Sequence, residues 1–139
     1  MPNWCDNRVE IYGFESDEEQ KAFIDFVSSD DSEFDFNKII PMPEALEDTT
    51  KGTNHVPSEE LKEKYGFDNW YDWRLHNWGT KWEANDIVEA EINGDYIMYN
   101  FQTPWGPPEG IYRALRDKFP DIEVSWFYDE PGVQIAGYL

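Results

Sequence analysis

The residues best suited to chemistry are two histidines, one cysteine and the carboxylates near them. Asp72 and His76 are four residues apart, which would place them on one face of a helix, and His55 falls in a segment that is typical of a loop. An acid beside a histidine can bind a cation or move protons. Two histidines and a single cysteine, however, give no recognisable metal-ligand spacing.

The motifs of common catalytic sites are also missing from the sequence. It contains no Gly-rich phosphate-binding loop, no nucleophile elbow and no H-E-x-x-H zinc motif. Cys5 falls on the apolar face of the first expected strand, where a buried and inert thiol is usual. We therefore expect no catalytic residue, no metal site and no cofactor, and the sequence favours a protein that is not an enzyme.

Seven tryptophans make the aromatic side chains the next candidates for function. Four of them stand near two asparagines and a lysine, and this group forms the candidate binding site: Trp4, Asn7, Asn77, Trp78, Lys81, Trp82 and Trp105. Tryptophan faces with a few amides can cradle a sugar or a base, or anchor a protein partner. The alternative is that these aromatics are core residues that lock an inserted segment onto the sheet.

Charge is the most unusual property of the chain, which has 30 acidic residues against 11 basic ones and a formal net charge of −19. Ten acids and a single base fall between Glu10 and Asp35. Such a surface repels nucleic-acid phosphates and anionic membranes, so the expected partner is a basic host protein. A rigid array of carboxylates can also imitate the charge spacing of DNA. The alternative is a solvated surface that keeps the protein soluble.

Periodicity and capping residues predict the elements that position these side chains. Alternating apolar residues predict strands at 5–12, 34–40, 88–92, 96–103, 122–129 and 133–139. Apolar stripes with capping signals predict helices at 16–28, 58–65, 69–78 and 107–119. The pair Asn93-Gly94 predicts a two-residue hairpin turn that places Ala90 opposite Ile97 and Val88 opposite Tyr99.

The order of these elements indicates the fold. Strand, helix, aromatic insertion, hairpin, helix and hairpin follow the βαββαβ order of a ferredoxin-like sheet. We expect an α+β fold: an antiparallel sheet with helices on one face, an inserted helical aromatic segment at about 37–85 and an extra C-terminal strand. The chain length fits a single domain, 1–139. The name describes topology alone, because one cysteine cannot supply the four thiolates of a usual iron–sulfur cluster.

Cysteine usage and hydropathy bear on the cellular compartment. A single cysteine excludes an internal disulfide and favours a reducing environment. No apolar run approaches the roughly 20 residues that span a bilayer. The N-terminal residues do not resemble a signal peptide. We therefore expect a cytoplasmic protein, and the sequence leaves its oligomeric state open.

Four motifs follow one another along the chain: Met1-Pro2-Asn3-Trp4-Cys5-Asp6-Asn7, Ile39-Ile40-Pro41-Met42-Pro43, Asn77-Trp78-Gly79-Thr80-Lys81-Trp82-Glu83-Ala84 and Phe101-Gln102-Thr103-Pro104-Trp105-Gly106-Pro107-Pro108. Together they resemble the YubB-type family, whose members carry a ferredoxin-like domain and look like accessory products of bacteriophages, plasmids and integrated elements. The resemblance implies a fold and a setting rather than a mechanism. Two positions depart from the family pattern: Gly106 replaces the usual Ser, and Glu83 replaces the usual Asn or Asp. A role that needs the Ser hydroxyl would be absent here.

Three functional hypotheses follow. The first is a non-enzymatic protein-interaction module of a mobile genetic element. The second is an acidic nucleic-acid mimic that inhibits a host DNA-binding or defence protein, and it predicts salt-sensitive binding that DNA competes. The third is a small-ligand or sugar binder, which requires an open pocket lined by the tryptophans.

Overall fold

The computed structural model describes residues 2–49 and 56–139, so His55 lies outside the described residues. Within them, one antiparallel sheet has the strand order β2-β3-β1-β4-β5. Its strands are β1 (Trp4–Tyr12), β2 (Asn85–Asn93), β3 (Tyr96–Pro104), β4 (Glu123–Glu130) and β5 (Ile135–Tyr138). The α-helices are α1 (Asp17–Val27), α2 (Phe36–Ile39), α3 (Glu59–Tyr65), α4 (Trp70–Asn77) and α5 (Glu109–Lys118), and the 3-10 turns are η1 (Glu44–Leu46) and η2 (Pro131–Val133).

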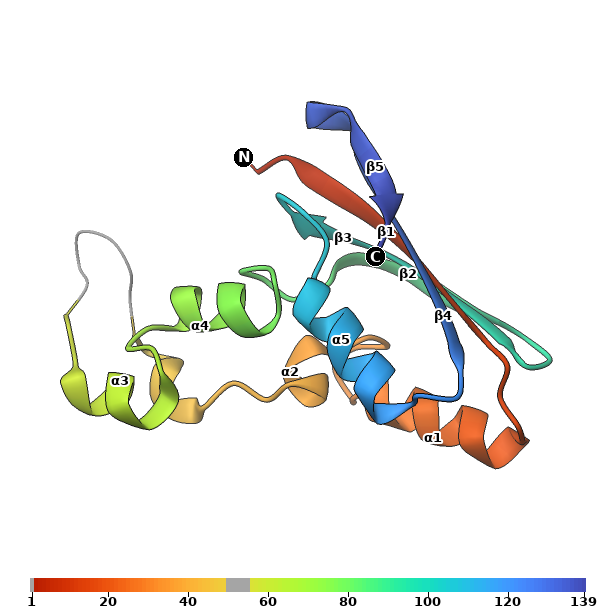
Figure 1. Ribbon diagram of the computed structural model, residues 1–139, viewed down its shortest axis with the longest axis horizontal. Coiled ribbons are helices and arrows are strands. Elements are labelled where there is room, and N and C mark those ends of the chain that lie inside the picture. The colour runs from red at the N-terminus through yellow and green to blue at the C-terminus, as the bar shows by residue number, and fades with distance from the viewer. Residues whose placement is uncertain (1, 50–55) are drawn as a thin grey trace.

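The connections between these elements give the ferredoxin-like topology. β1 lies between β3 and β4 and pairs with both in an antiparallel sense. A helix follows β1 and another follows β3, which is the βαββαβ arrangement. Helices α1, α2 and α5 lie on one side of the sheet, whereas α3 and α4 extend away from it (Figure 1). The predicted α+β fold is confirmed, with its helical insertion before β2 and its extra strand β5.

Local side-chain interactions explain where the main helices begin. At α1, Ser16 Oγ accepts a hydrogen bond from the Glu19 N–H (3.1 Å), as the capping box predicts. In a capping box the Glu19 side chain would accept from the N–H of Ser16. Here Glu19 Oε1 accepts instead from the N–H of Glu15 (3.0 Å). Helix α5 follows the Pro107-Pro108 pair that predicts it, and it begins at Glu109, two residues after the predicted start. None of the described helices is long and apolar enough to cross a bilayer.

An aromatic core fills the space between the helices and the inner sheet face. The largest fully buried side chains are those of Trp78, Trp126, Tyr99, Phe23, Phe34 and Phe36. Phe34 lies at the centre of this group, since its ring is 5.0 Å from the rings of both Tyr99 and Phe101. Burial of several large rings stabilises the fold through apolar area and edge-to-face contacts.

The predicted strand at 34–40 is wrong, because residues 36–39 form the short helix α2. The Asp35 side chain caps this helix by accepting from the N–H of Lys38 (3.2 Å). Phe36 and Ile39 are both buried at helical spacing. In so short a segment, an apolar run fits a helical turn as well as a strand.

The predicted hairpin register is also wrong. Asn93 pairs with Tyr96, so the two turn residues are Gly94 and Asp95, and Ile92 rather than Ala90 lies opposite Ile97. Gly94 takes φ +67°, which suits the first turn position. Two register irregularities in β2 then place Val88 opposite Asn100 instead of Tyr99.

Two smaller expectations also need correction. The aromatic spacing at 69–78 predicts a helix that is buried on two sides, but Trp73 is the only buried residue of α4 and Leu75 is 42% exposed. The last strand was expected from Val133, but Pro131–Val133 form a 3-10 turn and β5 begins at Ile135. The helix therefore contributes one face to the core, and the turn separates β5 from β4.

We predict that Gly110→Ala unfolds the protein, because the new Cβ would lie 1.8 Å from the carbonyl oxygen of Asn77. Backbone atoms cannot yield to such an overlap, so the free energy of unfolding should fall by at least about 3 kcal/mol. Thermal and denaturant unfolding measure this loss. Gly66→Ala is the control: nothing lies within 4 Å, and only its positive φ should cost about 1 kcal/mol. Equal losses in the two variants would contradict the packing.

Candidate functional site

Three of the predicted site residues come together at the end of the sheet where β1 begins. The Trp4 and Trp82 rings lie 6.0 Å apart, and Lys81 Nζ lies 4.5 Å from the centroid of the Trp82 ring. Trp82 is 38% exposed. Within the described part of the chain, Lys81 forms no ion pair. The ammonium group is therefore held by an aromatic face rather than by a carboxylate.

Trp105 lies at the same end of the sheet and is more exposed. It follows Pro104, which pairs with Trp4, and its side chain is 56% exposed. Its backbone has φ +68°, and its N–H donates to the carbonyl of Asn3 (2.8 Å). A bulky residue in the left-handed region costs conformational energy, so the fold holds this indole outward at a cost. We call Trp4, Lys81, Trp82 and Trp105 the tryptophan patch.

Of the other three predicted site residues, Asn7 and Trp78 lie inside the fold and Asn77 is half-buried. Asn7 Nδ2 donates to Thr103 Oγ1 (2.9 Å), and Asn7 Oδ1 accepts from the indole N–H of Trp126 (2.9 Å). Trp78 is fully buried, and its indole N–H donates to the carbonyl of Ile40 (2.9 Å). Asn77 Nδ2 donates to the carbonyl of Trp73 within its own helix (2.9 Å). Their polar groups are engaged by the protein itself.

Arg74 fixes the segment that carries the patch, and sequence reasoning missed it. Its guanidinium lies 5.1 Å from the Trp70 ring and 4.6 Å from the Trp78 ring, between two aromatic side chains. Nη1 donates to the carbonyl of Lys81 (3.2 Å). Burial lowers the pKa of Arg74, and the carboxylates of Glu83 and Glu47 partly oppose that shift. The arginine therefore acts as a rigid support for residues 79–84.

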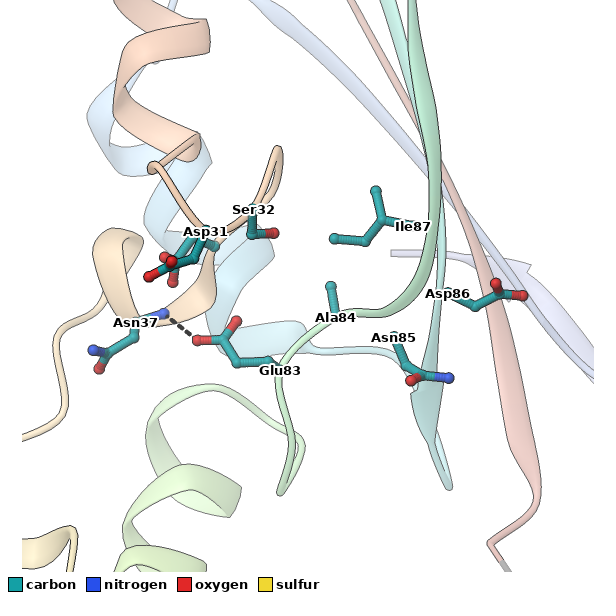
Figure 2. A pocket seen from close by; sticks show the side chains of 9 residues that line it. Asp31, Ser32, Asn37, Glu83, Ala84, Asn85, Asp86 and Ile87 are labelled. Atoms are coloured by element: carbon teal, nitrogen blue, oxygen red, sulfur yellow. Dashed lines mark hydrogen bonds between the residues drawn. The ribbon is translucent and has the colours of Figure 1, made fainter.

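A groove of about 510 Å³ opens beside this segment. Figure 2 shows the Asp31 and Glu83 carboxylates facing it, whereas the side chain of Asp86 points away. Its lining residues are Asp31, Ser32, Asp35, Asn37, Glu83, Ala84, Asn85, Asp86 and Ile87. This set, which we call the acidic groove, has four carboxylates and no lysine or arginine. The sequence shows the acids between Glu10 and Asp35 but gives no means of placing residues 31–35 beside residues 83–87.

Glu83 anchors the acidic groove to helix α2. Its carboxylate accepts from the N–H groups of Phe36 (2.7 Å) and Asn37 (2.9 Å), as Figure 2 shows for Asn37. Burial raises the pKa of Glu83 to about 7, and the neighbouring Asp35 adds to the rise while the two N–H donors oppose it. The position that departs from the YubB-type pattern is therefore a structural clamp between the 79–84 segment and α2.

The residues considered first for chemistry do not form a reactive centre among the described residues. Burial, helped by Glu130, raises the pKa of the Cys5 thiol to about 12, so it stays protonated and inert. His76 packs its ring 5.2 Å from that of Phe67, and Asp72 Oδ2 accepts from Asn69 Nδ2 (3.1 Å). No group of three or more His, Cys, Asp and Glu side chains in the described chain is placed to hold a metal ion.

Comparison with known proteins supports the fold. Residues 77–139 match a family described as "Ferredoxin-like domain in Api92-like protein". Over 99% of this chain and 93% of the other, the fold resembles the crystal structure of a protein Api92 from Yersinia pseudotuberculosis, with a TM-score of 0.55 and 13% identity. No curated protein sequence matches. At this identity the likeness establishes the fold alone, so the comparisons identify a ferredoxin-like domain and assign no activity.

We predict that Glu83 makes stability fall with rising pH. Its folded-state pKa of about 7 exceeds the ordinary value of 4.5, so the folded state binds the proton more tightly. The resulting stabilisation is complete below about pH 4.5 and is lost as the pH rises through about 7. Glu83→Gln should remove this decline, measured as the difference in unfolding free energy between variant and wild type from about pH 5 to about pH 8. Glu89→Gln, at an exposed carboxylate, should leave it intact. A decline that persists in Glu83→Gln would contradict the assignment.

Proposed function

We propose that the protein is a non-enzymatic interaction module that binds a basic segment of a partner protein. The outward-facing indole of Trp105 is the observation that carries this proposal. Large exposed tryptophans are uncommon on free surfaces and are enriched at the centres of protein interfaces. The backbone strain at this residue gives the exposure a cost.

The acidic groove determines the chemistry of the partner. The carboxylates of Asp31 and Asp35 line the groove without a lysine or arginine beside them, and they leave a negative potential that a cation of another chain can satisfy. Trp82 and Glu83 are consecutive residues, so one short segment contributes to both the tryptophan patch and the acidic groove. A partner with a basic side chain beside an apolar one fits both surfaces.

The cellular setting is part of the same proposal. The YubB-type resemblance supports an accessory protein of a mobile genetic element that acts in the bacterial cytoplasm. The nucleic-acid mimic is a narrower version, in which the basic partner is a DNA-binding or defence protein of the host. It differs by one requirement, because DNA must compete for the same partner surface.

We predict that Trp105→Ala weakens partner capture by at least about 30-fold, as for a residue at the centre of an interface. Tagged wild type and variants would be used to recover partners from host lysate at low and high salt, followed by affinity measurement on the purified partner. Tyr12→Ala is the matched control, because Tyr12 is 41% exposed on the open sheet face. Binding that survives in Trp105→Ala but not in Tyr12→Ala would refute the proposed surface.

A separate set of variants tests the role of the acidic groove. Asp31→Asn should weaken binding of the same partner and reduce its salt dependence, because a carboxylate that faces the groove is removed. Glu63→Gln, on exposed helix α3, should change neither. Competition by duplex DNA would identify the mimic. If the protein catalyses a reaction and Lys81→Ala or His76→Ala abolishes that catalysis, the proposal of a non-enzymatic module is wrong.

A further inference from the structure

The two edges of the sheet differ in how they are protected. Edge strand β2 and its turn carry four acids and no base, at Asp86, Glu89, Glu91 and Asp95. The strand also has two register irregularities, and its Ala90 N–H donates to Glu33 Oε2 (3.1 Å). Charges, bulges and covered N–H groups are the usual means of preventing an edge strand from pairing with another chain.

The opposite edge, β5, has none of these protections among the described residues. Residues 131–139 contain no charged side chain, and β5 shows no register irregularity. Ile135 is 54% exposed and Tyr138 is 63% exposed. An uncharged, apolar and regular edge is a template for a further strand.

Backbone geometry identifies the groups that are free to pair. The Leu139 N–H donates to the Trp126 carbonyl (3.0 Å), toward β4. Because successive N–H groups in a strand point to opposite sides, those of Ala136 and Tyr138 point away from β4. These two residues bracket Gly137, which has no side chain to obstruct a close approach. The backbone groups of β5 that point away from β4 are thus centred on Gly137.

Charge distinguishes between the candidate occupants of this edge. A groove of about 340 Å³ runs beside β5 and is lined by Glu109, Tyr112, Arg113, Tyr128, Tyr138 and Leu139. Helix α5, which supplies three of these residues, has three basic residues against two acidic ones, a net charge of +1. In a chain of net charge −19, helix α5 and the uncharged strand β5 therefore add no net negative charge that would repel another copy. A basic partner would be drawn to the acidic surfaces instead.

We propose that β5 pairs antiparallel with β5 of a second copy of this chain, about a twofold axis at Gly137, so that the two sheets become one. Ala136 of each copy then faces Tyr138 of the other, and every outward N–H of the strand gains an acceptor. The Glu109 and Arg113 side chains, 3.2 Å apart within one copy, form a self-complementary charge pair in an isologous interface. The strand β5 contributes no residue to the tryptophan patch or to the acidic groove.

The test is the mass of the protein in solution by sedimentation equilibrium. Wild type should reach twice its 16.5 kDa mass and should associate more tightly at high salt, which screens the repulsion between two acidic chains. Ile135→Lys should weaken association by at least about 30-fold. Ile92→Lys is the matched control, because Ile92 is 56% exposed on the other edge strand, and it should associate like wild type.

A proline variant and amide hydrogen exchange test the same pairing of β5 by other means. Ala136→Pro removes one outward N–H but no bond to β4, so it should remain folded by circular dichroism and become monomeric. In wild type, the amides of Ala136 and Tyr138 should exchange slowly in concentrated solution and rapidly on dilution. A monomeric wild type at every concentration would overturn the proposal, as would larger open assemblies or equal losses in Ile135→Lys and Ile92→Lys.

Discussion

The structure depends on one close approach, in which the Trp78 backbone packs directly against the start of helix α5. The Trp78 carbonyl accepts from the Gly110 N–H (3.0 Å), and only a glycine fits at that contact. The fully buried indole donates to the carbonyl of Ile40 in the loop after α2. One residue thus ties helix α4 to α5 and to the segment after α2. Because the inserted segment joins the ferredoxin-like core here, its position follows from this contact.

The contact between Trp78 and Gly110 also determines where residues 79–84 place their side chains. Gly79, at φ +88°, turns the chain out of the helix, and residues 80–84 then run back toward the sheet. Consecutive side chains in this stretch have different surroundings: Trp82 packs near Trp4, and Glu83 caps α2. The tryptophan patch and the acidic groove therefore share this one peptide. Disturbance of Arg74, which holds the peptide through the Lys81 carbonyl, would alter both.

The sequence predicts the parts of this arrangement that local chemistry determines. The capping pattern at Ser16 and the alternation in β1 predict elements that the structure confirms. The hairpin register and helix α2 depend instead on where bulges form and on which carboxylate reaches Phe36, and these are tertiary choices. In the candidate site, residue type cannot separate buried Trp78 from exposed Trp82, because both are tryptophans in one motif. The acidic groove brings residues 31 and 86 together, and no local pattern records that proximity.

The acidic residues are unevenly distributed over the surface of the molecule. Its net charge of −19 includes the acids along β2 and the acidic groove, whereas α5 and residues 131–139 carry almost none of it. A surface built only for solubility has no reason to leave one sheet edge uncharged while protecting the other. If both proposed surfaces operate, self-association through β5 would leave the acidic groove of each copy free. Two linked grooves would then bind a partner with repeated basic segments more tightly than one groove does, through effective concentration alone.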